Sequence, residues 1–173
     1  LKNESLQQKE VSLPVLAQFS SRMRTLDWTG RVLFNGERGV VGFIQKGGAF
    51  YGLAVDIGTT KMAAFLVDLG SGETVGRTAA MNPQIAYGED VVSRIAFANQ
   101  GISYRQKLQE MVVAELNQMA GELCRSVGAD HEQIADFVFV GNTAMHHLFT
   151  GLSVQQLGEA PYVPALRGSL NIP

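Results

Sequence analysis

The segment between Tyr51 and Asp68 carries the residues whose types and spacing are best suited to chemistry. An apolar stretch leads to one carboxylate, Asp56, and the turn Gly58–Thr60 separates it from a second apolar stretch. The backbone N–H groups of such a turn can bind an anion, and threonine hydroxyls can donate hydrogen bonds to phosphate oxygens. A single carboxylate suits Mg²⁺, which keeps most of its water ligands. The spacing favours a site for the terminal phosphates of a nucleotide and their metal ion, and the competing interpretation is a β-hairpin with a polar turn.

A meander of three strands is expected to position these groups. Apolar runs of strand length occupy residues 51–57, 62–68 and 73–81, and glycine-containing turns separate them. Gly58 permits a positive φ and a close approach of the backbone in the first turn. A fourth strand is expected at residues 134–140, and because nearly all of it is apolar we expect it in the interior of the sheet. The meander predicts antiparallel pairs and the helical crossover predicts a parallel pair, so the sheet is mixed.

Helices are expected at residues 11–25, 87–98 and 103–127 and between Asn142 and Gly151. The third of these has apolar residues spaced for one helical face, which is typical of a helix packed on a core. Ser103 with Gln106 resembles a capping box at its start. Near the N-terminus, strands at residues 31–35 and 40–45 are expected to form a separate hairpin around Asn35-Gly36.

Length and composition are those of a folded globular chain. The 173 residues allow one core, or one domain with part of another, and the double glycine Gly47-Gly48 divides them into residues 1–49 and 50–173. Apolar residues make up 46% of the chain, and a formal net charge of −2 argues against binding to nucleic acid or a membrane surface. Cys124 is the only cysteine, so this chain cannot form an intrachain disulfide or a four-cysteine iron–sulfur site.

Four motifs together resemble a known family. They are the segments Tyr51–Asp68, Asn82–Ile95, Gly141–Phe149 and Ala160–Pro164. The first resembles the first phosphate-binding motif of the actin, sugar-kinase and heat-shock-chaperone ATPase superfamily, and the four in this order resemble the ATP-dependent reductive activators of corrinoid proteins. The resemblance implies an α/β fold: an actin-like (ribonuclease H-like) half-lobe with a mixed sheet, preceded by a small α+β segment. Residues 1–49 would be the tail of a preceding, middle domain and its linker, and residues 50–173 the N-terminal part of an actin-like ATPase domain.

The resemblance also implies roles for the residues of the turn. Asp56 is implied to be the catalytic residue and to face Mg²⁺, usually through water. Phosphate contacts, mostly through backbone N–H groups, are implied for Gly58, Thr59 and Thr60. Lys61 stands where the family often has threonine, and it either reaches a phosphate as a point charge or points to solvent.

Two further groups of polar residues gain roles from the same resemblance. Asn142 and Thr143 lie between a predicted strand and a helix N-terminus, so they cap the helix, and they are implied to line the phosphate pocket. A place in the cleft, or on a surface for the corrinoid protein, is implied for Asn82, Gln84, Asp90 and Arg94. Because Asp90 and Arg94 are four residues apart, they also fit a simple ion pair on one helical face.

The family returns inactive Co(II) corrinoid proteins to Co(I) in a reaction driven by ATP. The resemblance therefore implies ATP and Mg²⁺, a corrinoid protein partner, a cytoplasmic location, and electrons from a [2Fe–2S] domain that this chain lacks. Alone, the chain is expected to hold half a nucleotide site, to show little ATPase activity and to be colourless. A homodimer stays open, and so does the question whether this piece is an enzyme. The alternatives are a small-molecule kinase, a dehydratase-activator ATPase of the same superfamily, or an ATPase-like module that docks a partner without turnover.

Overall fold

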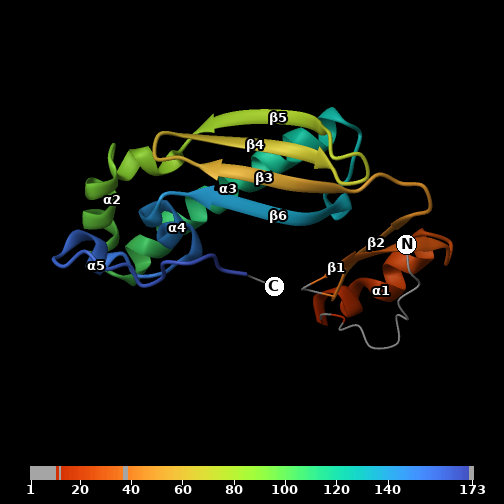
Figure 1. Cartoon of the computed structure of the whole chain (residues 1–173), viewed down its shortest axis with the longest axis horizontal. Coiled ribbons are helices and arrows are strands. Elements are labelled where there is room, and N and C mark those ends of the chain that lie inside the picture. Colours follow the sequence, from red (N-terminus) through yellow and green to blue (C-terminus); the bar gives the residue numbers. More distant parts are fainter. Residues whose placement is uncertain (1–10, 12, 37–38, 172–173) are drawn as a thin grey trace.

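A small unit and a larger unit make up the structure, a computed structural model (Figure 1). The described residues are 11, 13–36 and 39–171. The small unit consists of α1 (Leu13–Thr25) and an antiparallel hairpin of β1 (Gly30–Asn35) and β2 (Gly39–Gln45). The rings of Phe19 and Phe43 meet edge to face with their centroids 5.2 Å apart, which holds α1 against β2. The predicted helix and hairpin are therefore both present.

A four-stranded mixed sheet forms the centre of the larger unit. Its strands are β3 (Tyr51–Ile57), β4 (Lys61–Asp68), β5 (Thr74–Met81) and β6 (Ile134–Gly141), and their order across the sheet is β5-β4-β3-β6. The first three pair antiparallel, and β6 pairs parallel with β3 (Figure 1). The predicted meander and the predicted mixed sheet are confirmed.

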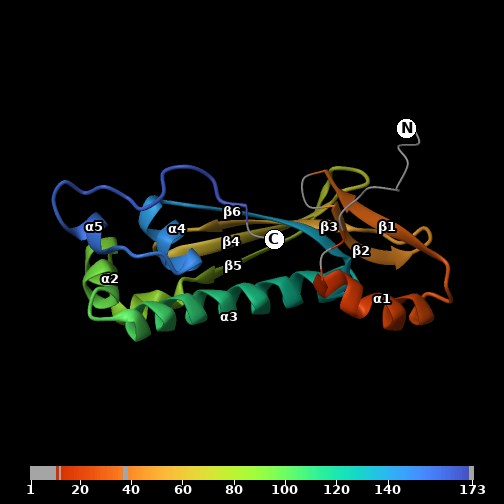
Figure 2. The ribbon, with the colours of Figure 1, turned by 90° about the horizontal axis from the view of Figure 1, so that it is seen from below.

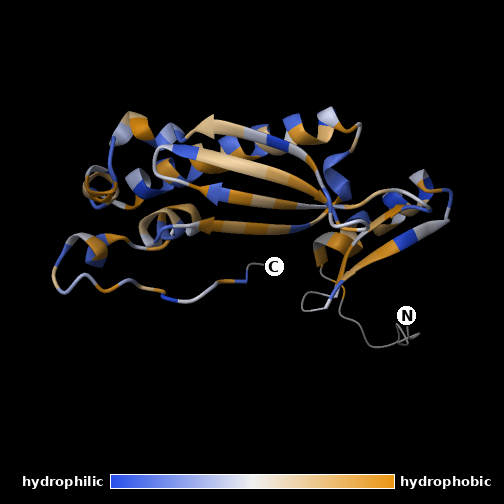
Figure 3. Ribbon diagram, turned by 45° about the horizontal axis from the view of Figure 1, so that its top comes forward, coloured by the Kyte–Doolittle hydropathy of each residue, from blue (hydrophilic) through white to orange (hydrophobic). Residues whose placement is uncertain are grey.

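The predicted interior position of the fourth strand is wrong for the described residues, because β6 lies at the edge of the sheet. It is hydrophobic over most of its length (Figure 3), yet Val138 is 56% exposed and Val140 is 58% exposed. A run of apolar residues indicates that the side chains on both faces of a strand are apolar. It does not indicate whether the strand has a hydrogen-bonded neighbour on each side.

One face of the sheet packs on the long helix α3 (Ile102–Ser126), which runs along the strands (Figure 2). Side chains alternate along β3, so that Val55 and Ile57 are buried in this core while Asp56 between them is exposed. The core residues of α3 include Leu108, Val112, Leu116, Met119, Leu123 and Cys124. We call the opposite side, which carries Asp56, Phe65, Val138 and Val140, the open face of the sheet.

Two helix starts differ from the prediction. The helix expected at residues 87–98 is present as α2 (Val91–Ala98), which begins only after Asp90, and the 3₁₀ turn η2 (Pro83–Tyr87) precedes it. Asp90 accepts a hydrogen bond from the Ser93 N–H over 2.7 Å and so caps α2. The predicted capping box at Ser103 is not formed, because α3 begins one residue earlier with Gly101 as its cap and without a side-chain cap.

The remaining elements connect and close the larger unit. They are η3 (His131–Gln133), α4 (Thr143–Thr150) and α5 (Gln155–Gly158). Fully buried His147 of α4 contacts the Thr143 carbonyl oxygen through Nδ1 at 2.7 Å, and its Nε2 accepts from the Leu166 N–H over 3.3 Å. This pair of contacts requires the neutral tautomer with the proton on Nδ1, and it fastens the C-terminal segment to α4.

Replacing Leu66 by alanine is expected to lower the free energy of unfolding by about 2–5 kcal/mol, because it leaves a cavity in the core. Leu66 on β4 is fully buried, whereas its neighbour Phe65 points to the open face and is 40% exposed. Phe65→Ala is therefore expected to cost markedly less. Urea denaturation of both variants measures the difference, and equal losses would contradict this assignment of the two faces.

Candidate functional site

Asp56 lies near the carboxyl end of β3, and its side chain is exposed on the open face. Its neighbours across the two adjacent strands are Ala63 of β4 and Val140 of β6. Neither of these two directly opposite neighbours carries a charge. The arrangement suits a carboxylate that binds a hydrated ion from solvent.

The turn after β3 depends on glycine for one of the two reasons predicted. The φ of Gly58 does not lie in the left-handed region, so the conformational freedom expected of it is not used. A Cβ atom at this position would overlap the carbonyl oxygen of Lys61. Gly58 is therefore required by the close approach of the two sides of the turn, which confirms the second half of the expectation.

Asn82 fixes the same turn from the inside. Its backbone N–H donates to the Thr60 carbonyl over 2.9 Å, and its side-chain amide donates to the Gly58 carbonyl over 2.8 Å. Its amide oxygen accepts from the Gln84 N–H over 3.0 Å, which caps η2. Because Asn82 is fully buried, it holds both ends of the turn in place and does not present a surface.

Asn142, in the segment Gly141–Phe149, contacts the turn after β3. It caps α4, with its amide oxygen accepting from the Met145 N–H over 3.0 Å. Its amide nitrogen donates to the Thr59 hydroxyl over 3.1 Å, although the two residues are 83 positions apart. Exposed Thr143 is the first residue of α4 beside this contact. The structure thus brings the turn and the N-terminus of α4 together.

Lys61 is the first residue of β4, and its side chain is exposed. Alternation along β4 places it on the same face as Ala63, which lies opposite Asp56. Lys61 and Asp56 therefore share the open face. A cationic side chain and a carboxylate on one face beside the turn have the charges that suit a phosphate group with a metal ion.

The four residues assigned to a cleft or partner surface do not all lie on the surface. Asn82, Gln84 and Arg94 are buried, and Asp90 alone is exposed. Arg94 donates from Nε to the Gly88 carbonyl over 2.8 Å and from Nη1 to the Met145 sulfur over 3.5 Å, so it does not form the expected ion pair with Asp90. The hydrogen bonds from Ser93 lower the pKa of the Asp90 carboxyl, and burial lowers the pKa of the Arg94 guanidinium.

Met145 lies behind the turn and contacts residues that support it, a role that the sequence did not indicate. Its sulfur accepts from Arg94 Nη1 and, over 3.7 Å, from Asn82 Nδ2. It therefore connects α4, η2 and α2 behind the turn. A methionine at an apolar position of a short helix carries no sequence signal that separates such a role from ordinary packing.

Metal-binding clusters are absent from the part of the chain that the structure describes: no three His, Cys, Asp or Glu residues there are placed to hold one ion together. Cys124 is buried in α3, and burial raises the pKa of its thiol. A single carboxylate such as Asp56 stays compatible with Mg²⁺, because this ion needs only one or two protein ligands beside water and phosphate.

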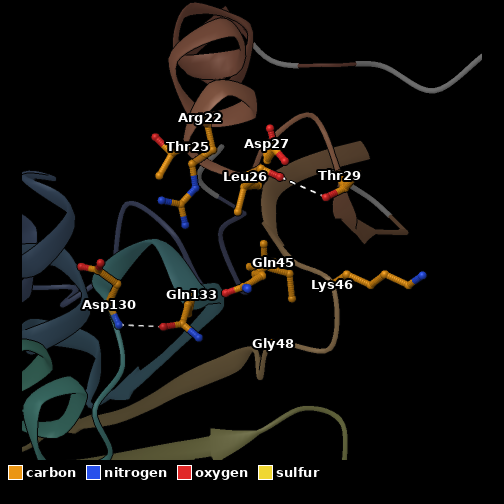
Figure 4. Close-up of a pocket in the computed structure, with 11 residues that line it drawn as sticks. Arg22, Thr25, Leu26, Asp27, Thr29, Gln45, Lys46, Gly48, Asp130 and Gln133 are labelled. Atoms are coloured by element: carbon orange, nitrogen blue, oxygen red, sulfur yellow. Dashed lines mark hydrogen bonds between the residues drawn. The ribbon is translucent and has the colours of Figure 1, made fainter.

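Two cavities are lined by neither Asp56 nor the Gly58–Thr60 turn. A groove of about 830 Å³ runs along β6 and is lined by α4 and the C-terminal segment, with Thr143 on its wall. A pocket of about 470 Å³ lies where α1, the end of β2 and η3 meet (Figure 4). Arg22 forms an ion pair with Glu132 near this pocket, and Gln133 donates to the Ala49 carbonyl over 2.9 Å. The pocket thus marks the junction of the two units and contains none of the predicted site residues.

Comparison with known proteins places the chain in a family. Residues 51–173 match the model of the RACo middle region. The corrinoid activation enzyme RamQ of Eubacterium limosum is 33% identical over 144 residues, which covers 82% of this chain and 24% of that protein. A solved structure of a reductive activator for corrinoid, iron-sulfur protein has a TM-score of 0.73 at 30% identity and covers 90% of this chain and 26% of that one.

The chain spans about a quarter of the length of both relatives. The described residues include no helix with the length and apolar character that a membrane span requires. The α/β architecture with a mixed sheet agrees with the solved relative. Because the family model matches well over half of its residues, the chain belongs to the RACo middle region family.

Proposed function

We propose that the protein containing this chain is an ATP-dependent activator that reduces corrinoid proteins from Co(II) to Co(I). The observation that carries the proposal is the hydrogen bond between Asn142 and Thr59, which joins two polar motifs beside Asp56. The names of the two relatives, a corrinoid activation enzyme and a reductive activator for a corrinoid, iron-sulfur protein, support the choice of substrate. A corrinoid protein is then the partner, and the cytoplasm is the proposed location.

We assign the larger unit to the first half of an actin-like lobe. An antiparallel meander followed by a helical crossover to a parallel strand supports this assignment. In such a lobe the turn between the first two strands faces a nucleotide, and a second lobe is needed to close the site. Residues 1–49 are assigned to the preceding domain and its linker, and a homodimer is compatible with this arrangement.

The site residues take the following roles in the proposal. Asp56 would hold Mg²⁺ through water, and the ion would supply positive charge that stabilises the transferred phosphoryl group. The N–H groups of Gly58, Thr59 and Thr60 orient the phosphate oxygens. Lys61 adds a positive charge from the open face. Asn142 and Thr143 hold the N-terminus of α4 beside the same oxygens.

In this proposal, the electron that reduces the corrinoid does not pass through the nucleotide site. One electron converts Co(II) to Co(I), and we assign its donor to a [2Fe–2S] domain elsewhere in the protein. Cys124 supports this division, because a cluster of this kind normally takes four protein ligands and Cys124 is buried alone in α3. The role of this chain is then to couple nucleotide binding to electron transfer.

The proposal is tested with the protein at its full natural length and an inactive Co(II) corrinoid protein. Visible absorption spectra follow the appearance of Co(I) in the presence of a reductant. Formation of Co(I) is expected to require both ATP and Mg²⁺ and to stop when a chelator removes the ion. Equal formation of Co(I) with and without nucleotide would contradict the ATP requirement.

A further inference from the structure

Arg94 is a cation in the interior of the larger unit. The residue is 0% exposed, and its guanidinium donates hydrogen bonds to a carbonyl oxygen and a sulfur atom. Its Nη2 group is buried and has no hydrogen-bond partner. Buried arginine is usually paired with a carboxylate, because removing an unpaired charge from water is costly. An interior cation held by neutral groups therefore calls for a functional explanation.

Asp90 is the acidic residue whose charge acts on Arg94, but it does not form an ion pair with the guanidinium. Asp90 raises the pKa of the guanidinium only as a secondary effect, and burial lowers that pKa more strongly. The Asp90 carboxylate is exposed to solvent, and it is engaged by the Ser93 N–H at the start of α2. The positive charge of Arg94 is consequently screened little by its surroundings, and its electrostatic field reaches the neighbouring residues.

Three contacts lead from the guanidinium to the turn. Arg94 Nη1 lies 3.5 Å from the Met145 sulfur, and the same sulfur lies 3.7 Å from Asn82 Nδ2. Asn82 Nδ2 in turn donates to the Gly58 carbonyl over 2.8 Å. The Gly58 oxygen and the Thr59 N–H belong to one peptide group, so a positive potential behind that oxygen strengthens the N–H as a donor on the other side.

We propose that Arg94 is a positioning residue that attracts nucleotide phosphates to the Gly58–Thr60 turn from behind, through the interior of the protein and without touching the nucleotide. The inference rests on the proposed nucleotide site. The three contacts limit the distance between the guanidinium and the Gly58 oxygen to about 10 Å. A phosphate bound by the Thr59 N–H lies on the other side of that peptide group, about 15 Å or less from the guanidinium. At that range, with an effective dielectric constant of about 20, one unit charge changes affinity by about sixfold per phosphate charge.

The test compares AMP, ADP and ATP, without Mg²⁺, by isothermal titration of the full-length protein. The variant Arg94→Met removes the charge and keeps a long apolar side chain. Its affinity loss is expected to grow by about sixfold for each phosphate charge that the site holds, whereas a defect of packing alone would weaken all three nucleotides equally. Arg125→Met, the same change at an exposed arginine near the end of α3, is expected to leave the three affinities unchanged.

Two further variants keep the test decisive where Arg94→Met does not fold. Arg94→Lys retains the charge, and Met145→Leu removes the sulfur acceptor while leaving the charge in place. Both are expected to keep the preference of the unchanged protein for ATP over AMP within about threefold. Loss of that preference in either variant, or an equal loss for all three nucleotides in Arg94→Met, overturns the inference. Failure of the unchanged protein to bind any of the nucleotides rejects the nucleotide site itself.

Discussion

Replacing Gly58 by alanine is expected to abolish phosphate binding at the turn and to destabilise the larger unit by about 2–4 kcal/mol. The added Cβ would overlap the Lys61 carbonyl oxygen, and this oxygen belongs to the backbone, so it cannot move like the end of a flexible side chain. The turn must therefore open. Opening it separates Asn82 from the Gly58 and Thr60 carbonyls, which leaves buried polar groups unpaired.

Urea denaturation and nucleotide titration measure the two effects in the same preparation. Gly168→Ala is the matched control, because a Cβ at Gly168 meets no atom within 4 Å and its φ is not in the left-handed region. This control is expected to alter neither stability nor binding. Wild-type stability in Gly58→Ala would show that the turn tolerates the extra atom, and it would contradict the steric requirement for glycine at this position.

Replacing Asp56 by asparagine is expected to reduce ATP hydrolysis by the full-length protein by about 100-fold or more, while stability changes by about 0.5 kcal/mol or less. The side chain is exposed and asparagine has the same shape, so the fold has little reason to change. The lost negative charge removes the ligand to which we assign Mg²⁺. Release of inorganic phosphate at saturating ATP measures the rate.

Glu73→Gln provides the control for this change. It makes the same exchange of carboxylate for amide at an exposed residue in the turn before β5. Its rate of hydrolysis is expected to equal that of the unchanged protein. A normal rate in Asp56→Asn would remove Asp56 from the catalytic site, and a low rate that excess Mg²⁺ restores would support its role as a metal ligand.

The sequence predicted the parts of this fold that depend on local pattern. Apolar runs of strand length located β3, β4 and β5, and the glycines between them located the turns. Asn142 was expected to cap α4, and it does. Each of these features is decided within about ten neighbouring residues, where strand alternation, turn chemistry and helix capping act directly.

The features that the sequence did not predict depend on distant contacts. The edge position of β6 follows from what lies beside it, and the apolar run in its sequence reports only its faces. The spacing of Asp90 and Arg94 fits an ion pair, but the guanidinium turns inward because the Gly88 carbonyl and Met145 receive it there. The contact between Thr59 and Asn142 is likewise set by the parallel pairing of β3 with β6.

The separation of Thr59 from Asn142 has a consequence for the order of folding. The meander closes short loops between neighbouring strands, whereas β6 joins β3 only after the chain has returned along α3, and long closures cost more entropy. We therefore expect the contact between Thr59 and Asn142, which are 83 positions apart, to form late. When only the meander has formed, Asp56 and the turn are in place, but Asn142 does not yet donate its hydrogen bond to Thr59. A ligand that binds the finished site then stabilises the whole unit, because only the fully folded state offers it.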